Sequence, residues 1–181
     1  RVYGVVIGIV TNLDDPDGLG RVKVKIPTRS DEYETTWARV TTPMAGSSMG
    51  IFFMPEVDEE VLLAFHEGNI NQPIVIGRLW SSQSKPPASS TGAYFADGKV
   101  KVRKIKTGGG SELIFDEESG KEKITLKTNA GAQILMDDEN KKIEIKDSSG
   151  NNKVNIDGNG NTISIEANTK VEIKVSSTTL T

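Results

Sequence analysis

Few residues of this 181-residue chain have the types and spacing that chemistry requires. His66 is the only histidine and stands directly before Glu67, a pair that could act as general base and acid. A metal site needs several ligands, and the sequence supplies no second histidine and no cysteine. We therefore interpret His66 as a surface or packing residue, and we predict no catalytic residue, no metal site and no cofactor.

Three other stretches carry residues that could do chemistry. Asp14, Asp15 and Asp17 cluster in LDDPDGLG, but the ligand spacing and distal Glu of an EF-hand calcium loop are missing, so we predict a solvated loop. KTGGGSE at residues 106–112 lacks the order of a phosphate loop, which favours a tight turn. The paired carboxylates of DEEV and FDEES fall at turns or on outward faces, whereas glycoside hydrolysis needs two across a cleft.

The bulk composition excludes several classes of protein. The formal net charge is −3, with −4 through Trp80 and +1 after it, so neither half has the basic excess of a nucleic-acid binder. Without cysteine, disulfides and thiolate metal sites are excluded. The longest apolar run, VVIGIV, is far too short to span a membrane.

The first half of the chain predicts strands joined by irregular loops. Val22, Val24 and Ile26 alternate with basic residues, so they are expected to share one face. Five strands in 80 residues, with a long excursion after the third, predict a small Greek-key barrel of the OB type. The predicted strands cover residues 3–12, 19–27, 37–43, 58–69 and 72–80.

The pattern changes after residue 80. Paired prolines and several serines predict a linker at residues 81–98. From residue 99 to 181, short pairs of alternating apolar residues recur every 8 to 11 residues, separated by turns of Gly, Asn, Ser and Asp. This is an internal repeat of the β-solenoid kind. We predict three parts: an OB barrel at 1–80, the linker, and a shaft at 99–181.

The repeat predicts a shaft that one chain cannot stabilise alone. Each strand would bury only two or three apolar side chains, too few to offset the entropy lost on ordering. Three chains wound together would bring their apolar sets to one axis, with each strand between strands of its neighbours. The predicted fold class is all-β, an N-terminal OB-fold barrel followed by a C-terminal intertwined trimeric β-helix. The predicted trimer core consists of Leu113, Phe115, Ile124, Leu126, Ile134, Met136, Ile143, Ile145, Val154, Ile156, Ile163, Ile165, Val171 and Ile173.

The order of several blocks resembles a known family. GLGRVKVKIP, followed by WARVTTPMAGSSMGIFFMPEVDEEVLLAFHEGNINQPIVIGRLW, is similar to the OB domain of central spike proteins from contractile injection machines. These include the baseplate assembly protein V family of phage tails and the valine-glycine repeat (VgrG) spikes of type VI secretion. KTGGGSELIFDEESGKEKITLKTNAGAQILMDDENKKIEIKD resembles the start of the family's trimeric β-helix. The resemblance covers nearly the whole chain and implies that Val61 and Phe65 point into the barrel and that Gly68 lies in a turn.

The resemblance implies a non-enzymatic homotrimeric spike. Such a spike is assembled in the bacterial cytoplasm, docks on the baseplate hub protein and tail tube, and pierces the target cell envelope when the sheath contracts. The linker is too short for the lysozyme domain of some members, and no hub domain precedes the barrel. We therefore expect a phage-tail or tailocin-like particle, with a type VI or extracellular injection-system spike fragment as the alternative.

Two further questions stay open at this point. Some family members bind iron through histidines at the tip, and no histidine follows His66, so either a separate PAAR-type tip protein or further residues would complete the end. An OB-fold module that binds single-stranded nucleic acid or sugar is a second class. It would need an aromatic platform and a basic groove, which ten aromatic residues and an acidic barrel do not favour, so we expect no nucleic-acid partner.

Overall fold

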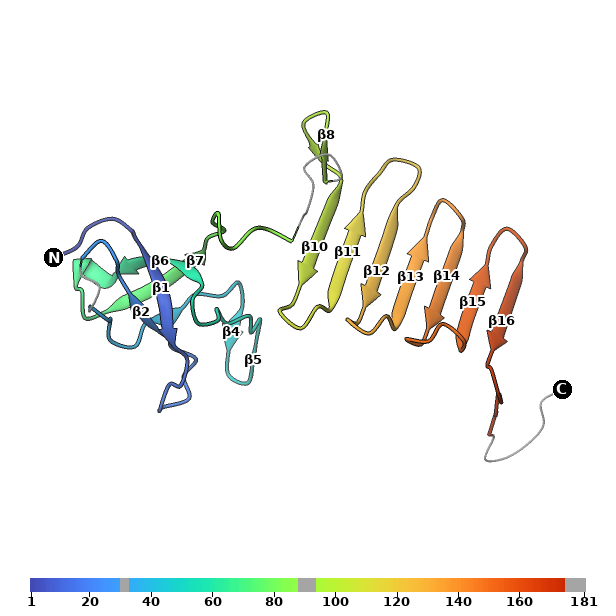
Figure 1. Cartoon of the computed structure of the whole chain (residues 1–181), viewed down its shortest axis with the longest axis horizontal. Coiled ribbons are helices and arrows are strands. Elements are labelled where there is room, and N and C mark those ends of the chain that lie inside the picture. The colour runs from blue at the N-terminus through green and yellow to red at the C-terminus, as the bar shows by residue number, and fades with distance from the viewer. Residues whose placement is uncertain (30–32, 88–93, 175–181) are drawn as a thin grey trace. The chain divides into compact units, whose positions relative to one another are not determined.

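A computed structural model describes residues 1–29, 33–87 and 94–174 (Figure 1). The chain forms two compact units, Arg1–Pro86 and Pro87–Thr181, and nearly all of the regular secondary structure in each consists of β-strands. The division between them lies within residues 81–98, the predicted linker, of which residues 88–93 are outside the described part. Each unit has its own large sheet.

The first unit contains a five-stranded sheet that closes on itself. Neighbouring strands are antiparallel except β3 and β7, which are parallel. Isolated bridges from Val22 to Ala38 and from Lys25 to Glu34 join β2 to the segment that leads into β3. The ring is therefore complete, and the predicted OB-type barrel is confirmed. The sheet order is β2-β1-β6-β7-β3, formed by β1 (Val6–Asn12), β2 (Lys23–Lys25), β3 (Arg39–Val40), β6 (Glu60–Phe65) and β7 (Pro73–Arg78).

Alternating side chains fill the barrel. Val22, Val24 and Ile26 are fully buried, as the alternation of LGRVKVKIP predicted. Every second residue of β6 is buried too, and the inward positions expected for Val61 and Phe65 are confirmed. The period of two in a strand is the physical reason, because successive side chains point to opposite faces. The complete core consists of Val10, Val22, Val24, Ile26, Ala38, Val61, Leu63, Phe65 and Val75.

Two small elements decorate the barrel. The long excursion between β3 and β6 carries a hairpin of β4 (Ala45–Gly46) and β5 (Met49–Gly50). A short 3-10 turn, η1 (His66–Gly68), joins β6 to β7. Gly68 has a φ of +72°, and a Cβ added there would lie 3.1 Å from the Tyr3 ring. The expected turn at Gly68 is therefore confirmed, and it depends on the absence of a side chain.

The acidic loop after β1 is organised around one arginine. The Arg21 guanidinium bonds the Asp15 carboxylate at 2.6 and 2.9 Å and the Asp17 carboxylate at 2.5 Å. The backbone N–H of Leu19 also donates to Asp15, whose side chain is only 3% exposed. The Arg21 guanidinium holds the pKa of Asp15 well below its usual range. The loop is exposed as predicted except at Asp15, whose carboxylate is covered by Arg21 and ties the loop to the segment before β2.

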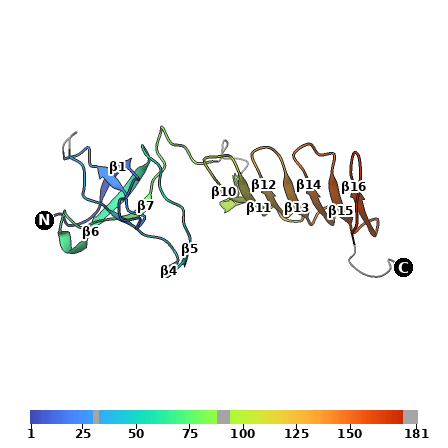
Figure 2. The ribbon, with the colours of Figure 1, turned by 90° about the horizontal axis from the view of Figure 1, so that it is seen from below.

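The second unit is a seven-stranded antiparallel sheet whose spatial order follows the sequence. Figures 1 and 2 show the strands side by side from β10 to β16. A small hairpin of β8 (Phe95–Ala96) and β9 (Lys99–Val100) precedes them. Seven strands at about 4.8 Å each span roughly 30 Å from edge to edge. The strands are β10 (Val102–Lys106), β11 (Glu112–Asp116), β12 (Lys123–Lys127), β13 (Gln133–Asp137), β14 (Lys142–Lys146), β15 (Lys153–Asp157) and β16 (Thr162–Glu166).

The solenoid-like repeat is confirmed, but the expected interleaving of chains is not what the strands show. Each strand from β11 to β15 pairs on both sides with the preceding and following strand of its own chain. The connecting turns have only four to six residues, and such turns return the chain directly to the adjacent position. Strand edges are therefore covered within the chain, and only β10 and β16 keep an open edge in this sheet.

Six of the seven predicted apolar pairs lie on strands β11 to β16. The seventh pair, Val171 and Ile173, lies outside the strands, where the side chains are 47% and 63% exposed. The sheet instead gains β10 as its first strand, which contributes Ile105 opposite Leu113. The stretch KVKVRKIKT at residues 99–107, in which basic and apolar residues alternate, contains β9 and β10.

The barrel core gives a first test of the fold. Replacing Leu63, which is fully buried, with Ala should lower the free energy of unfolding by about 2–5 kcal/mol, because a cavity remains among the neighbouring side chains. Urea denaturation followed by tryptophan fluorescence measures this change. Ile7→Ala on the outer face of β1, at 48% exposure, is the matched control and should cost much less. Equal losses for both variants would contradict the assigned core.

The Asp15–Arg21 pair predicts a pH dependence with a defined sign. Because the folded-state pKa of Asp15 is depressed, its contribution to stability is fully present above the unfolded value of about 3.9. It is lost as the pH falls below that value. The difference in unfolding free energy between the native chain and Asp15→Asn should therefore be constant at about pH 5 to 7. It should shrink in more acidic solution. A difference that grows with acid would refute the assignment.

Candidate functional site

One face of the second sheet is apolar along its whole width from β11 to β16. The strand registers place each predicted core residue of these strands directly opposite another one. Aliphatic and aromatic pairs of this kind are the usual unit of sheet stabilisation. The opposed pairs include Leu113 with Leu126, Phe115 with Ile124, Ile134 with Ile145, Met136 with Ile143, Val154 with Ile165 and Ile156 with Ile163.

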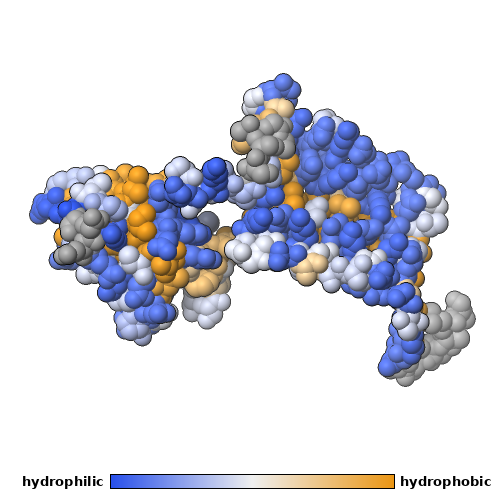
Figure 3. Space-filling view, viewed as in Figure 1, coloured by the Kyte–Doolittle hydropathy of each residue, from blue (hydrophilic) through white to orange (hydrophobic). Residues whose placement is uncertain are grey.

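This apolar face is uncovered in a single chain. Leu126 is 51% exposed, Ile145 48% and Ile163 74%, whereas Glu112 on the other face is only 7% exposed. Figure 3 shows hydrophobic side chains lying among hydrophilic ones on this unit. Soluble proteins rarely expose large contiguous apolar areas unless another molecule covers them. Such exposure is typical of a surface that another molecule covers, and we call it the apolar face of β11–β16.

The opposite face carries ordered charges. Glu112 on β11 forms ion pairs with Lys104 at 3.5 Å, Lys106 at 3.2 Å and Lys127 at 3.3 Å. Burial pushes the pKa of Glu112 upward, but hydrogen bonds from Lys106 and Lys127 and the charge of Lys104 hold it below its ordinary value. Glu112 is therefore ionised and links three strands.

Charges also alternate directly across the strands along one edge of this face. The registers place oppositely charged residues side by side from β11 to β15, in the order Asp116, Lys123, Asp137, Lys142 and Asp157. Asp137 bonds Lys123 at 3.2 Å and the Asn140 side chain at 3.0 Å. This row of alternating charges was not predicted from the sequence. The pattern that could have indicated it is the matching position of charged residues at the strand ends in FDEES, KITLK, QILMD and KIEIK.

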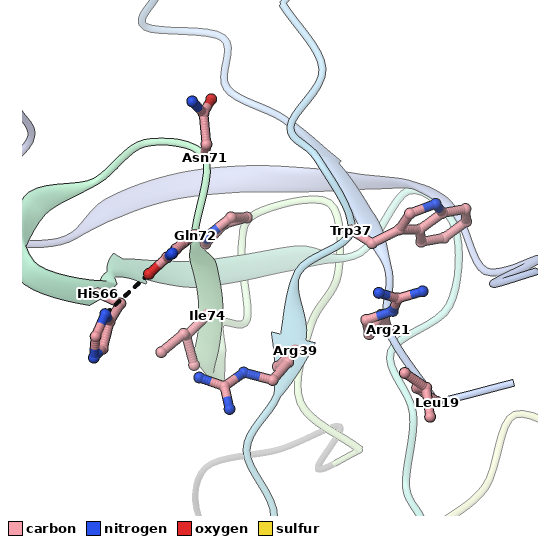
Figure 4. Close-up of a pocket in the computed structure, with 9 residues that line it drawn as sticks. Leu19, Arg21, Trp37, Arg39, His66, Asn71, Gln72 and Ile74 are labelled. Carbon is pink, nitrogen blue, oxygen red and sulfur yellow. Dashed lines mark hydrogen bonds between the residues drawn. The ribbon is translucent and has the colours of Figure 1, made fainter. Parts of the chain in front are cut away.

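The barrel has an open groove of about 610 Å³ (Figure 4). Arg21 at this groove is already bound to Asp15 and Asp17, and Lys23 lies 5.5 Å from the Trp37 ring centre. Within the described residues, Arg39 has no ion-pair partner. The groove is lined by Leu19, Arg21, Trp37, Arg39, His66, Asn71, Gln72, Pro73 and Ile74. An aromatic ring and a cation without an ion-pair partner among the described residues both line this groove.

His66 has a structural role at the edge of this groove. Its Nδ1 lies 2.9 Å from Oε1 of Gln72, and its backbone N–H donates to the Gln72 carbonyl (Figure 4). These bonds hold the two ends of the β6–β7 connection together. In the described ranges, no three His, Asp or Glu side chains gather closely enough to hold a metal ion. His66 is exposed and lies at a strand connection, which agrees with the surface alternative of the prediction.

The remaining sequence motifs fall at turns. KTGGGSE connects β10 to β11, where Gly110 has a φ of +85° and donates its N–H to the Thr107 carbonyl. Glu59 of DEEV pairs with Arg78, and Glu117 of FDEES pairs with Arg103. These carboxylates neutralise neighbouring basic residues of their own unit. In the part of the chain that the structure describes, no helix is long and apolar enough to cross a bilayer.

Comparison with known proteins identifies the first unit. Residues 6–80 match the family model of the type VI secretion system/phage-baseplate injector OB domain. This range contains all five barrel strands, from the start of β1 to just beyond β7.

Relatives extend the similarity into the second unit. The type VI secretion system spike protein VgrG3 of Vibrio cholerae is 35% identical over 118 residues, 61% of this chain and 11% of the relative. VgrG2a of Pseudomonas aeruginosa, also a type VI spike protein, is 39% identical over 75 residues, 39% of this chain and 9% of the relative. The actin cross-linking toxin VgrG1 of V. cholerae is 33% identical over 118 residues, which are 61% of this chain and 10% of the relative.

The matches thus span about a tenth of the length of these relatives. The barrel topology, the repeat that follows it and the matched domain agree with one another. Residues 6–80 therefore form an injector OB domain, and the chain is similar to VgrG spike proteins of type VI secretion systems.

Proposed function

We propose that this chain acts as a homotrimeric central spike whose function is mechanical rather than enzymatic. The observation that carries the proposal is the apolar face of β11–β16, which one chain leaves exposed. The injector OB domain and the similarity to VgrG spike proteins support the same role.

The size of the apolar face argues that copies associate. Ten of its twelve side chains are between 37% and 74% exposed, so each of these has roughly 1 kcal/mol to gain on being covered. The sum is on the order of 10 kcal/mol per chain. Association of protein chains costs about 4–15 kcal/mol in lost freedom and ordering. The free energy gained when two copies cover each other's apolar faces therefore exceeds the cost of association. In a single chain the apolar face stays exposed to water.

Three copies fit the proposal better than two. Three sheets can close into a three-sided shaft with every apolar face inside and every charged face in water. Two sheets would make a sandwich instead. The resemblance to a trimeric β-helix favours three. The core of this shaft would consist of the apolar pairs on β11 to β16, with Val171 and Ile173 extending it only if residues beyond β16 join the assembly.

A shaft of this kind is suited to transmit force. Each inner strand is hydrogen-bonded on both sides, so bending the sheet requires several ladders to break together. The proposed partners are the baseplate hub protein and tail tube behind the barrels, a PAAR-type tip protein, and the target cell envelope. The particle would be assembled in the bacterial cytoplasm and would act at that envelope.

The most specific part of the proposal is the type of particle to which the spike belongs. The sequence favoured a phage-tail or tailocin-like particle, whereas the named relatives are type VI spike proteins and the family model covers both. Mass spectrometry of intact particles that contain the chain distinguishes them. Phage-type sheath and tube proteins would support the first origin, and type VI proteins would support the alternative.

An OB-fold binding module is the second candidate, because Trp37 and Arg39 lie in one groove. Stacking on an aromatic ring beside a cation is the usual basis of single-strand binding. For a spike we expect no saturable binding of a fluorescent single-stranded oligonucleotide at physiological salt. Saturable binding that Arg39→Gln weakens would instead make the groove the functional site.

Replacing Ile145 with Asp tests the proposed assembly. The change should leave a single-chain species, because three carboxylates would otherwise be buried at one level of the shaft. Light scattering on the purified chain measures the outcome. The native chain should give three times its mass of 19.6 kDa.

Thr125→Asp is the matched control, since it adds the same charge to the opposite face between Lys123 and Lys127. This variant should keep the mass of three chains. A stable trimer of Ile145→Asp would count against the buried face, and a dimer of the native chain would favour the sandwich.

A further inference from the structure

Several exposed apolar side chains of the barrel unit, among them Phe52, gather on the segment between β3 and β6. Phe52 is 80% exposed, Met49 65%, Phe53 57% and Met44 47%. We call residues 43–54 the apolar hairpin, because they contain β4, β5 and the residues that follow. Large exposed aromatic and Met side chains are enriched in protein interfaces. Nothing within the described barrel covers them.

The apolar hairpin is held in a defined shape. Its strands pair through Ala45 with Gly50 and Gly46 with Met49, and the Ile51 N–H donates to the Met44 carbonyl at 3.0 Å. The Thr42 hydroxyl donates to the Ile51 carbonyl at 2.6 Å.

The far end of the hairpin is anchored as well. Pro55 is fully buried, and Met54 packs against the barrel core. The exposed rings are thus presented from a fixed backbone, which lowers the entropy lost when a partner binds them.

The charge pattern points to the occupant. Residues 43–54 contain no Asp, Glu, Lys or Arg, in a chain of which 26% is charged. In a three-fold assembly, neighbouring copies meet through different patches, and only residues close to the axis meet their own counterparts. A charged side chain at that place would face its own sign. An uncharged apolar surface avoids this repulsion and is complementary to itself.

The stretch at residues 2–13 is also free of charged residues and exposes Tyr3, Val5 and Ile7. Ile7 and Ile76 are exposed on the outer face, but Glu60 and Arg78 interrupt that face. The groove of Figure 4 contains Arg21 and Arg39.

We propose that the apolar hairpin is the contact between neighbouring barrels in the assembled protein, with a second copy of this chain as its partner. The inference rests on the proposed homotrimer, because the shaft would bring the barrels of three copies together. It adds a second interface, between barrels, to the one that the apolar face of β11–β16 would form in the shaft.

Cysteine cross-linking tests this contact directly, because the chain has no cysteine of its own. Met49→Cys in the full chain, treated with a short bifunctional maleimide, should give covalently linked copies. Ile7→Cys, an equally apolar position outside the hairpin, is the matched control and should stay largely unlinked. Adding Phe52→Asp to Met49→Cys should lower the linked fraction about tenfold, and the high exposure of Phe52 means that the barrel itself should still fold.

Light scattering of the same variants separates this inference from the proposed function. A mass of three chains with no linkage at Met49→Cys, or with equal linkage at Ile7→Cys, would overturn the hairpin contact and leave the spike intact. A single-chain mass would overturn both. Linkage of Met49→Cys to a different protein of the particle, in place of a second copy, would likewise overturn the contact and assign the hairpin to that protein.

Discussion

The apolar face of β11–β16 is the constraint on which the second unit depends. In an antiparallel meander with turns of four to six residues, the chain can only add the next strand beside the last. Every strand from β11 to β16 therefore turns its pair of alternating apolar residues to the same side, with Ile114 and Leu135 on the other face. No described segment returns to cover these pairs. A sheet with one uncovered apolar side is not a stable end state in water. Its folding and its association are thus expected to be linked.

The charged face determines which register that sheet adopts. A slip of one residue would move every aliphatic side chain to the other face, and a slip of two would leave the faces intact. The alternating row from Asp116 to Asp157 opposes the second error, because the shift would separate the paired charges. Individual surface pairs contribute little, but a network repeated across strands favours one register over its neighbours.

Much of this architecture could be predicted from alternation alone. The barrel core around Val24 and Val61, and the strands that carry Ile124 and Ile145, follow from a period of two in the sequence. Pairing within the chain was not predicted, because the apolar pattern is the same whether the adjacent strand belongs to this copy or another. The burial of Asp15 depends on the geometry of Arg21, which no spacing rule encodes. The groove at Trp37 and Arg39 joins segments that are far apart in the sequence.

The two units solve the problem of covering an apolar sheet in different ways. The barrel curls until β2 meets the segment before β3, so its core is closed without help from another chain. The repeat stays open and leaves its core face to be completed from outside. In the proposed spike, the closed barrel and the open repeat would have different tasks. A self-contained barrel can dock on other baseplate components as a folded body, while a shaft that is stable only as an assembly is held straight by the same contacts that hold its copies together.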